Sequence, residues 1–187
     1  MATIIVTEFV SLDGVMEDPG GSENFKYGGW SFEFDRSDEG DKFKLDETME
    51  SDGLLLGHKT YDEFAKFWPT REGEFAEKFN ALPKYVVGSS VDTDKWSNST
   101  ALDGIDAVRR LKDEQDGKLV VHGSAQLVQS LLDADLVDEL RLMVFPVVLG
   151  EGKRVFGPVS EKKTWKLAES RTLGNEGILV LIYRKEA

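Results

Sequence analysis

The amino-acid sequence predicts an α/β fold in which helices cover both faces of a mainly parallel sheet that ends in an antiparallel hairpin. Short apolar runs of strand length alternate with segments of helical spacing along most of the chain. Repeated strand–helix–strand units favour parallel strands, because each crossover helix returns the chain to the end of the sheet where it started. The carboxyl-terminal part contains two β-like segments around a glycine-rich turn, which indicates a hairpin.

The amino-terminal elements come first in this pattern. Ile4–Val10 is predicted as the first strand, and the charged segment 35–50 as a solvent-facing helix. Gly53–Gly57 (GLLLG) is a short apolar run with a glycine at each end, as expected of a buried parallel strand. Between the first two elements, Asp18–Trp30 contains Pro-Gly-Gly and Gly-Gly and is predicted to be a flexible loop.

The middle of the chain continues the alternation. A helix is predicted from apolar residues at i, i+3, i+4 and i+7, namely Tyr61, Phe64, Ala65 and Trp68. Pro69 ends this helix, and Lys84–Gly88 follows as another short strand. A further helix begins near Asp103 and ends before Gly117.

The last third contains a strand, a helix and a β-rich end. Lys118–His122 is predicted as a strand, and Ser124 as the cap of the helix after it. The buried side of that helix carries Leu127, Val128, Leu131 and Leu132. Val137–Leu149 is a long β-like run, and 164–184 forms two strands around Gly174–Gly177.

Bulk composition limits the function classes. The 187 residues fit one domain, 1–187, with no linker or repeat. A net charge of −12 argues against nucleic acid as a partner, and no apolar segment is long enough for a membrane helix. The absence of cysteine excludes disulfides and thiolate zinc sites, and it fits a reducing, cytoplasmic location. The two histidines, His58 and His122, form no recognisable metal-binding spacing, so no metal site is expected.

Two glycine-bearing segments are candidates for phosphate binding, because ligands of open α/β sheets bind beyond the carboxyl ends of the strands. Gly57-His58-Lys59-Thr60 opens a helix, where free amides, a cation and a hydroxyl would attract an anion. Gly123-Ser124-Ala125-Gln126 opens a second helix in the same way, as a pyrophosphate site. A plain strand-to-helix turn with a surface lysine is the alternative for the first segment.

Other strand ends carry weaker candidates. Ser89 and Ser90 could hold an adenosine ribose or its 2′-phosphate, or form an ordinary loop. Asp13, beside Gly14, could orient a heterocycle or relay a proton, whereas Asp-Gly also simply makes turns. Trp30 could wall a planar ligand. The loop that contains Gly152 precedes Lys153 and Arg154, which could meet a substrate phosphate or remain solvated.

Taken together, these segments resemble the dihydrofolate-reductase-like reductases that include the reductase domain of the bifunctional riboflavin-biosynthesis deaminase/reductase. The markers occur in order along nearly the whole chain: Ser11–Gly14, Gly57–Tyr61, Val86–Ser90, Val121–Leu127, Leu136–Leu140, and Pro146–Gly152 continuing to Phe156. The resemblance is greatest to small stand-alone members without a deaminase domain. It implies a three-layer α/β/α fold of the dihydrofolate reductase type.

The resemblance also implies an activity: an NADPH-dependent oxidoreductase, cytoplasmic and homodimeric. Lys59 and Thr60 would meet the phosphate portion of NADPH, Ser89 and Ser90 the adenosine side, and Gly123–Gln126 the pyrophosphate. Asp13 and Gly14 would lie near the nicotinamide and the substrate. Hydride would pass to a pterin or to a ribosylaminopyrimidine, as in 5-amino-6-(5-phosphoribosylamino)uracil reductase.

Two features leave alternatives open. His58 stands where this family usually has arginine, so the choice between NADPH and NADH is not fixed. A chain that kept the nucleotide cleft and lost the chemistry would be a non-catalytic nucleotide- or heterocycle-binding module with the same fold.

Overall fold

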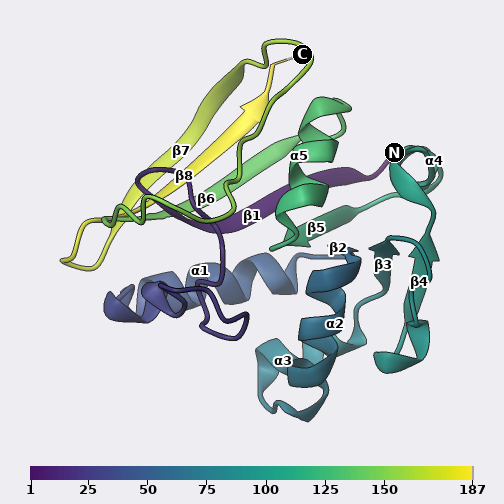
Figure 1. Ribbon diagram of the computed structural model, residues 1–187, viewed down its shortest axis with the longest axis horizontal. Helices are drawn as coiled ribbons and strands as arrows, with labels where there is room; N and C mark the ends of the chain where they lie inside the picture. The colour runs from purple at the N-terminus through teal and green to yellow at the C-terminus, as the bar shows by residue number, and fades with distance from the viewer. Residues whose placement is uncertain (187) are drawn as a thin grey trace.

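Apolar runs form the centre of one eight-stranded sheet in the computed structural model, which describes residues 1–186 (Figure 1). The strands are β1 (Thr3–Ser11), β2 (Gly53–Gly57), β3 (Lys84–Val87), β4 (Ser99–Leu102), β5 (Lys118–His122), β6 (Glu139–Phe145), β7 (Trp165–Leu173) and β8 (Ile178–Lys185). Their order is β4-β3-β2-β5-β1-β6-β8-β7. All pairs from β4 to β6 are parallel, and β8 and β7 add an antiparallel hairpin. The predicted fold class is confirmed.

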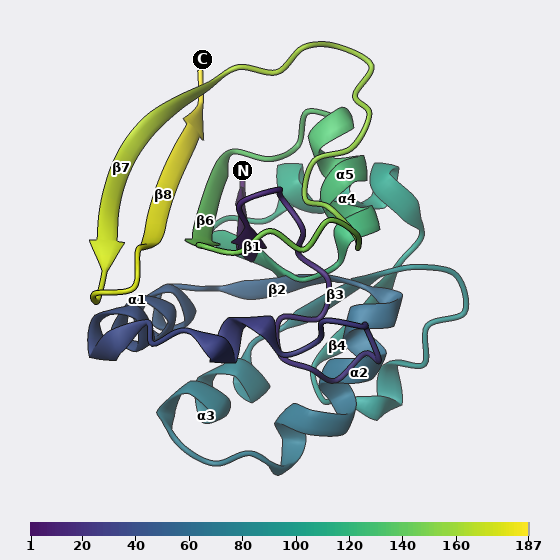
Figure 2. The ribbon, with the colours of Figure 1, turned by 60° about the vertical axis from the view of Figure 1, so that its left-hand side comes forward.

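Helices cover both faces of the sheet. They are α1 (Ser37–Met49), α2 (His58–Phe67), α3 (Glu74–Ala81), α4 (Gly104–Glu114) and α5 (Ala125–Asp133), with short 3₁₀ turns η1 (Trp30–Glu33), η2 (Trp68–Thr70) and η3 (Thr93–Lys95). Figure 2 shows α4 and α5 on one side of the sheet and α1, α2 and α3 on the other. Each strand of the middle of the sheet is therefore buried on both faces, as its continuous apolar sequence requires.

Several predicted boundaries need correction. The run Val137–Leu149 is a strand only over β6, since the chain leaves the sheet after Phe145. The sequence did not reveal α3, whose eight residues bury only Ala76 and Phe79. It also did not reveal β4, a four-residue strand that shows no buried residue. Short elements of this kind lack the repeated apolar positions from which periodicity is recognised.

The segment Asp18–Trp30 is a loop, as predicted, and Asp18 organises it. The Asp18 carboxylate is buried and accepts the backbone N–H groups of Ser22 and Phe25 at 2.6 and 3.2 Å. The Asp18 carbonyl oxygen accepts the N–H groups of Gly21 and Gly29. The loop is therefore folded around one acidic side chain.

Phe145 is the centre of an aromatic cluster between α1 and the β6–β8 part of the sheet. It is fully buried, and its ring contacts Phe9, Trp30 and Phe34 with centroid distances of 5.3, 5.5 and 6.0 Å. These edge-to-face and tilted contacts add to the free energy gained from burying the rings.

No helix in the described part of the chain is long and apolar enough to cross a membrane.

Replacing Phe145 by alanine is expected to lower the free energy of unfolding by about 3 to 5 kcal/mol, because it leaves a cavity among three other rings. Urea denaturation followed by tryptophan fluorescence measures this loss. Phe156→Ala is the control, since this ring is half exposed. Equal losses in the two variants would contradict the importance of the cluster.

Candidate active-site cleft

A cleft with a volume of about 1650 Å³ opens at the carboxyl ends of β1, β2 and β5. Pockets for single drug-sized ligands have volumes of roughly 300–1,000 Å³, so this cleft has space for a large ligand and a second molecule. Its walls are the loop after β1, the exposed side of α1, the α2–α3 region and the start of α5. The location is the one expected for ligand binding in an open α/β sheet.

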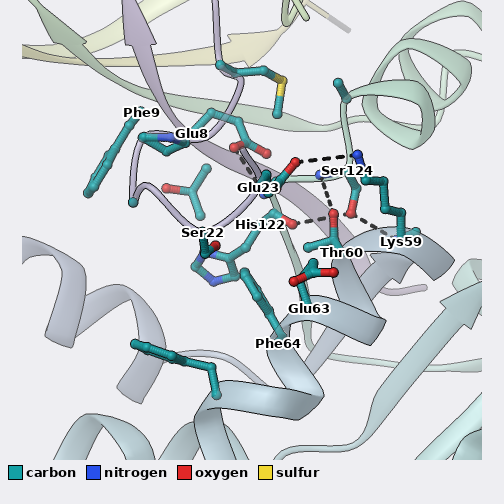
Figure 3. A pocket seen from close by; sticks show the side chains of 18 of the residues that line it. Glu8, Phe9, Ser22, Glu23, Lys59, Thr60, Glu63, Phe64, His122 and Ser124 are labelled. Atoms are coloured by element: carbon teal, nitrogen blue, oxygen red, sulfur yellow. Dashed lines mark hydrogen bonds and ion pairs between the residues drawn. The ribbon is translucent and has the colours of Figure 1, made fainter. Parts of the chain in front are cut away.

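The starts of α2 and α5 lie side by side in this cleft because Ser124 connects them (Figure 3). The Ser124 hydroxyl accepts the N–H of Gly57 at 2.9 Å, and the Ser124 N–H is donated to Oγ1 of Thr60 at 3.0 Å. The first-turn amides of both helices have no partner within their own helix. Together they form one region of positive potential, in which an anion would be stabilised.

The backbone at Gly123 and Ser124 makes this arrangement possible. Both residues adopt left-handed φ angles, +58° and +64°. A Cβ atom at Gly123 would lie 3.1 Å from Cγ2 of Thr60, so glycine permits the close approach of the two helix starts. Ser124 is the N-cap residue of α5, as predicted, but its hydroxyl makes no cap hydrogen bond and accepts the Gly57 N–H instead.

The structure brings most of the predicted cofactor-binding residues into the cleft. Those that line it are Gly57, His58, Lys59, Thr60, Ser89, Gly123, Ser124, Ala125 and Gln126. Ser90 is exposed in the turn after β3 and does not line the cleft, so its contact with a cofactor stays a prediction. His58 packs over Gly88, and its Nε2 lies 3.4 Å from the carboxylate of Asp62.

The cations of the cleft face carboxylates. Lys59 lies 3.7 Å from Glu23, and Lys153 lies 3.6 Å from Glu17. Acidic side chains outnumber lysine and arginine along the whole lining. A bound phosphate would therefore depend mainly on the backbone amides at the two helix starts.

Asp13 lies outside the cleft, contrary to its predicted catalytic role. Its carboxylate accepts the Ser11 hydroxyl at 2.6 Å and the N–H groups of Leu149 and Gly150 at 3.1 and 2.8 Å. The Ser11 hydroxyl above all, with help from those two amides, lowers the pKa of Asp13 from 3.8 to about 2. An acid this strong remains ionised near neutral pH, so it holds a turn and is a poor proton donor.

Gly14, Gly152 and Trp30, which were also predicted to contact a ligand, do not line the cleft either. Gly14 and Gly152 have φ angles of +79° and +115°, and they shape the contact between the turn after β1 and the segment 147–155. Trp30 is only 1% exposed, packs on Phe145, and donates its indole N–H to the carbonyl of Glu17 at 2.8 Å. It is therefore a core residue and cannot wall a ligand.

The sequence reasoning missed two polar side chains on the cleft floor: Glu8, which is buried, and His122, which is half-buried (Figure 3). Oε2 of Glu8 accepts the Gly123 N–H at 3.0 Å, whereas Oε1 is buried and has no partner among the described residues. Burial raises the pKa of Glu8 well above its ordinary value, although Lys44 and the Gly123 amide oppose this. An acid inside the otherwise apolar run of β1 was the available signal in the sequence.

The pKa of His122 shifts in the opposite direction from that of Glu8. Its Nε2 is buried without a partner among the described residues, and its ring lies edge-on to Phe79 at 5.3 Å. Burial lowers the pKa of His122 well below 6.5, and Lys44 contributes in the same direction. The imidazole is therefore neutral near neutral pH.

Aromatic side chains form the wall of the cleft beside His122. They are Phe64, Phe67, Trp68, Phe75 and Phe79, all from α2, η2 and α3. Phe75 and Phe79 stack with their centroids 5.3 Å apart. Such a wall suits a flat, aromatic ligand.

In residues 1–186, no three His, Cys, Asp or Glu side chains group closely enough to hold a metal ion.

Known proteins share both the sequence pattern and the fold. The family model described as "RibD C-terminal domain" matches residues 2–179. Two uncharacterized proteins of Bacillus subtilis (strain 168) are each 29% identical: YyaP over 71% of this chain and 73% of its own, and YwjB over 88% of both.

Two solved structures are similar throughout. One, from Shewanella sp. PV-4, is described only provisionally as a riboflavin biosynthesis protein; it has a TM-score of 0.77 at 21% identity and covers 100% of both chains. The other is dihydrofolate reductase from Enterococcus faecalis, complexed with NADP(H) and RAB-propyl. Its TM-score is 0.63 at 12% identity, over 99% of this chain and 97% of the other. These similarities confirm the dihydrofolate-reductase-like fold.

Replacing Asp13 by alanine is expected to lower the free energy of unfolding by about 1 to 3 kcal/mol near neutral pH, because two loop amides lose their acceptor. The folded protein binds fewer protons at Asp13 than the unfolded chain between the unfolded pKa of 3.8 and the folded value of about 2. The difference from wild type should therefore be complete above pH 3.8 and shrink as the pH falls toward 2. Urea denaturation across this range measures it.

Asp113→Ala is the control for Asp13→Ala, because Asp113 is exposed on α4. An Asp13→Ala protein of unchanged stability that no longer binds ligand would restore Asp13 to the active site.

Proposed function

Because the chain belongs to the RibD C-terminal domain family, we propose that it is an NADPH-dependent reductase acting on a pterin- or ribosylaminopyrimidine-like substrate. Family membership supports the reductase type of activity. Our proposal adds that the cofactor is NADPH and that the substrate is pterin- or ribosylaminopyrimidine-like. When bound, the reduced nicotinamide would supply a hydride, and the protein would supply binding, orientation and electrostatics.

One observation carries the proposal: two helix starts with free amides share one cleft. A dinucleotide carries several phosphate charges, and the cleft lining has fewer lysines and arginines than acidic side chains. The hydrogen bonds of Ser124 to Gly57 and Thr60 place both helix starts where they can act on one ligand. The cleft volume of about 1650 Å³ leaves space for a substrate beside a dinucleotide.

The lining residues fit such a cofactor in a definite way. Lys59 and the amides near Thr60 would contact one phosphate group, and Ser89 would contact the adenosine side. The amides of Ala125 and Gln126 would contact the pyrophosphate, since the amides of Gly123 and Ser124 already have acceptors in Glu8 and Thr60. His58 is positively charged only when it is protonated, so the preference for NADPH over NADH would be moderate.

The aromatic wall from Phe64 to Phe79 supports a planar heterocycle as the substrate. A pterin or pyrimidine ring could stack there, beside the polar floor formed by Glu8 and His122. The excess of acidic side chains favours a substrate without a phosphate group. A cleft that binds nucleotide without turnover is the second candidate, and it is favoured by the location of Asp13 outside the cleft.

NADPH is expected to bind with micromolar to submillimolar affinity, and Lys59→Met should raise the dissociation constant about 5-fold, as the loss of about 1 kcal/mol implies. Cofactor fluorescence titration measures both. Lys78→Met on α3 is the matched control, because Lys78 is half-exposed and does not line the cleft. No binding of NADPH or NADH at millimolar concentration would refute the proposal. Binding without oxidation by any dihydropterin or aminopyrimidine tested would favour the non-catalytic alternative.

We further propose that the protein is a homodimer formed through the β7–β8 hairpin. β7 is the outer strand of the sheet, and nearly all its residues are exposed or half-exposed. Leu167 and Leu179 on the hairpin are 48% and 37% exposed. An edge strand of this length with exposed apolar side chains pairs readily with another chain.

Leu167→Glu is expected to convert this dimer to a monomer, because like charges would meet across the interface and apolar contact would be lost. Light scattering after size exclusion measures the mass. Leu12→Glu, in the turn after β1, places the same charge on another exposed leucine and should leave the dimer intact. A wild-type protein that is monomeric at high concentration would refute the dimer.

A further inference from the structure

Glu8 occupies an unusual position on the cleft floor. It lies near the carboxyl end of β1, the strand between β5 and β6 in the sheet, and only 6% of its surface is exposed. One carboxyl oxygen, Oε2, is fixed by the Gly123 N–H. The other, Oε1, has no partner among the described residues, and Glu8 lines the cleft (Figure 3). A buried oxygen without a partner costs free energy unless a ligand completes its hydrogen bonding.

The hydrogen bond to Gly123 decides where a proton on Glu8 would reside. An oxygen that accepts an amide hydrogen has the character of a carbonyl oxygen, so the proton of the neutral acid belongs on Oε1. Burial raises the pKa of Glu8, which keeps this proton in place closer to neutral pH than in an ordinary glutamate. A protonated Glu8 would therefore carry its O–H group at Oε1, the oxygen that has no partner among the described residues.

The two charged side chains that shift the pKa of Glu8 both lie on α1. Lys44 of α1 lowers the pKa of Glu8, and Glu47 of the same helix raises it. Those two side chains are themselves joined at 2.6 Å, and Thr7 donates its hydroxyl to Glu47 at 2.9 Å. His122 of β5 is neutral and adds no opposite charge. Desolvation is the largest influence and outweighs the lysine.

The other acidic residues of the cleft are unsuited to the same task. Each of the following has a cationic or backbone partner: Glu17, Asp18, Glu23, Asp41, Asp62 and Glu63. Glu72 and Glu74 are exposed to solvent. Asp13 lies outside the cleft, and its pKa of about 2 keeps it ionised.

We propose that Glu8 is the proton donor of the reduction, a role that rests on the proposed function. The substrate carbon of a C=N bond gains a C–H bond from the incoming hydride, and the π electron pair moves to the nitrogen. The nitrogen forms an N–H bond with the proton of Glu8 Oε1, whose O–H bond breaks. The substrate is reduced by two electrons, the dihydronicotinamide is oxidised to the nicotinamide cation, and Glu8 regains its proton from water.

The first test measures the protonation of Glu8 without any turnover. Carbon-13 NMR of protein labelled at the glutamate carboxyl carbons should show one resonance that titrates well above the ordinary 4.5. This resonance should disappear in Glu8→Gln and persist in Glu114→Gln, a matched change at an exposed site on α4. If every glutamate titrates near its ordinary pKa, Glu8 is ionised near neutral pH and the proposal fails.

The second test measures hydride transfer in a single turnover with NADPH and dihydropterin or aminopyrimidine probes. Glu8→Gln should bind NADPH within about 2-fold of wild type and slow hydride transfer at least about 100-fold, the contribution typical of a general acid. The wild-type rate should fall as the pH rises through the pKa of Glu8, and the variant should lack this decline. Glu114→Gln should match wild type throughout.

The outcomes separate the two proposals. A wild-type protein that neither binds NADPH nor reduces any probe refutes the proposed function, and the NMR titration still decides whether Glu8 holds a proton. A wild-type protein that is active, with an equally active Glu8→Gln variant, refutes the role of Glu8 alone.

Discussion

The hydrogen bonds between Ser124 and the start of α2 are the constraint on which the cleft depends. Gly57 and Thr60 lie on one side of this contact and Ser124 on the other, and each side supplies both a donor and an acceptor. Without this pairing the two helix starts would present separate weak anion sites. With it, the free amides of both helix starts face one cleft, whose lining has more acidic side chains than lysines and arginines.

Polarity on the cleft floor has a thermodynamic cost. Glu8 and His122 each have a buried atom without a partner among the described residues, and beside them Thr7, Lys44 and Glu47 form a hydrogen-bonded charged group. An apolar floor would stabilise the fold more. Their location at the carboxyl ends of the central strands is the pattern expected where stability is given up for ligand chemistry.

The sequence predicted the fold well because the central strands are buried on both faces and are therefore continuously apolar. It failed where the determining contact is distant in the chain. Asp13 looked catalytic because its acceptor role for Leu149 and Gly150 depends on the path of a distant loop. The glycines at the two helix starts were found, because a strand–glycine–helix transition is local, whereas the free oxygen of Glu8 became evident only from its three-dimensional surroundings.

The hydrogen bonds around Asp13 also limit how far the turn after β1 can move relative to the segment 147–155. The turn after β1 and the segment 147–155 are joined at both ends, by Leu12 N–H to the Val147 carbonyl and by Val155 N–H to the Gly14 carbonyl. Met16, which lines the cleft, donates its N–H to the carbonyl oxygen of Lys153. Because these hydrogen bonds join the two segments at several points, neither segment can shift relative to the other without breaking some of them.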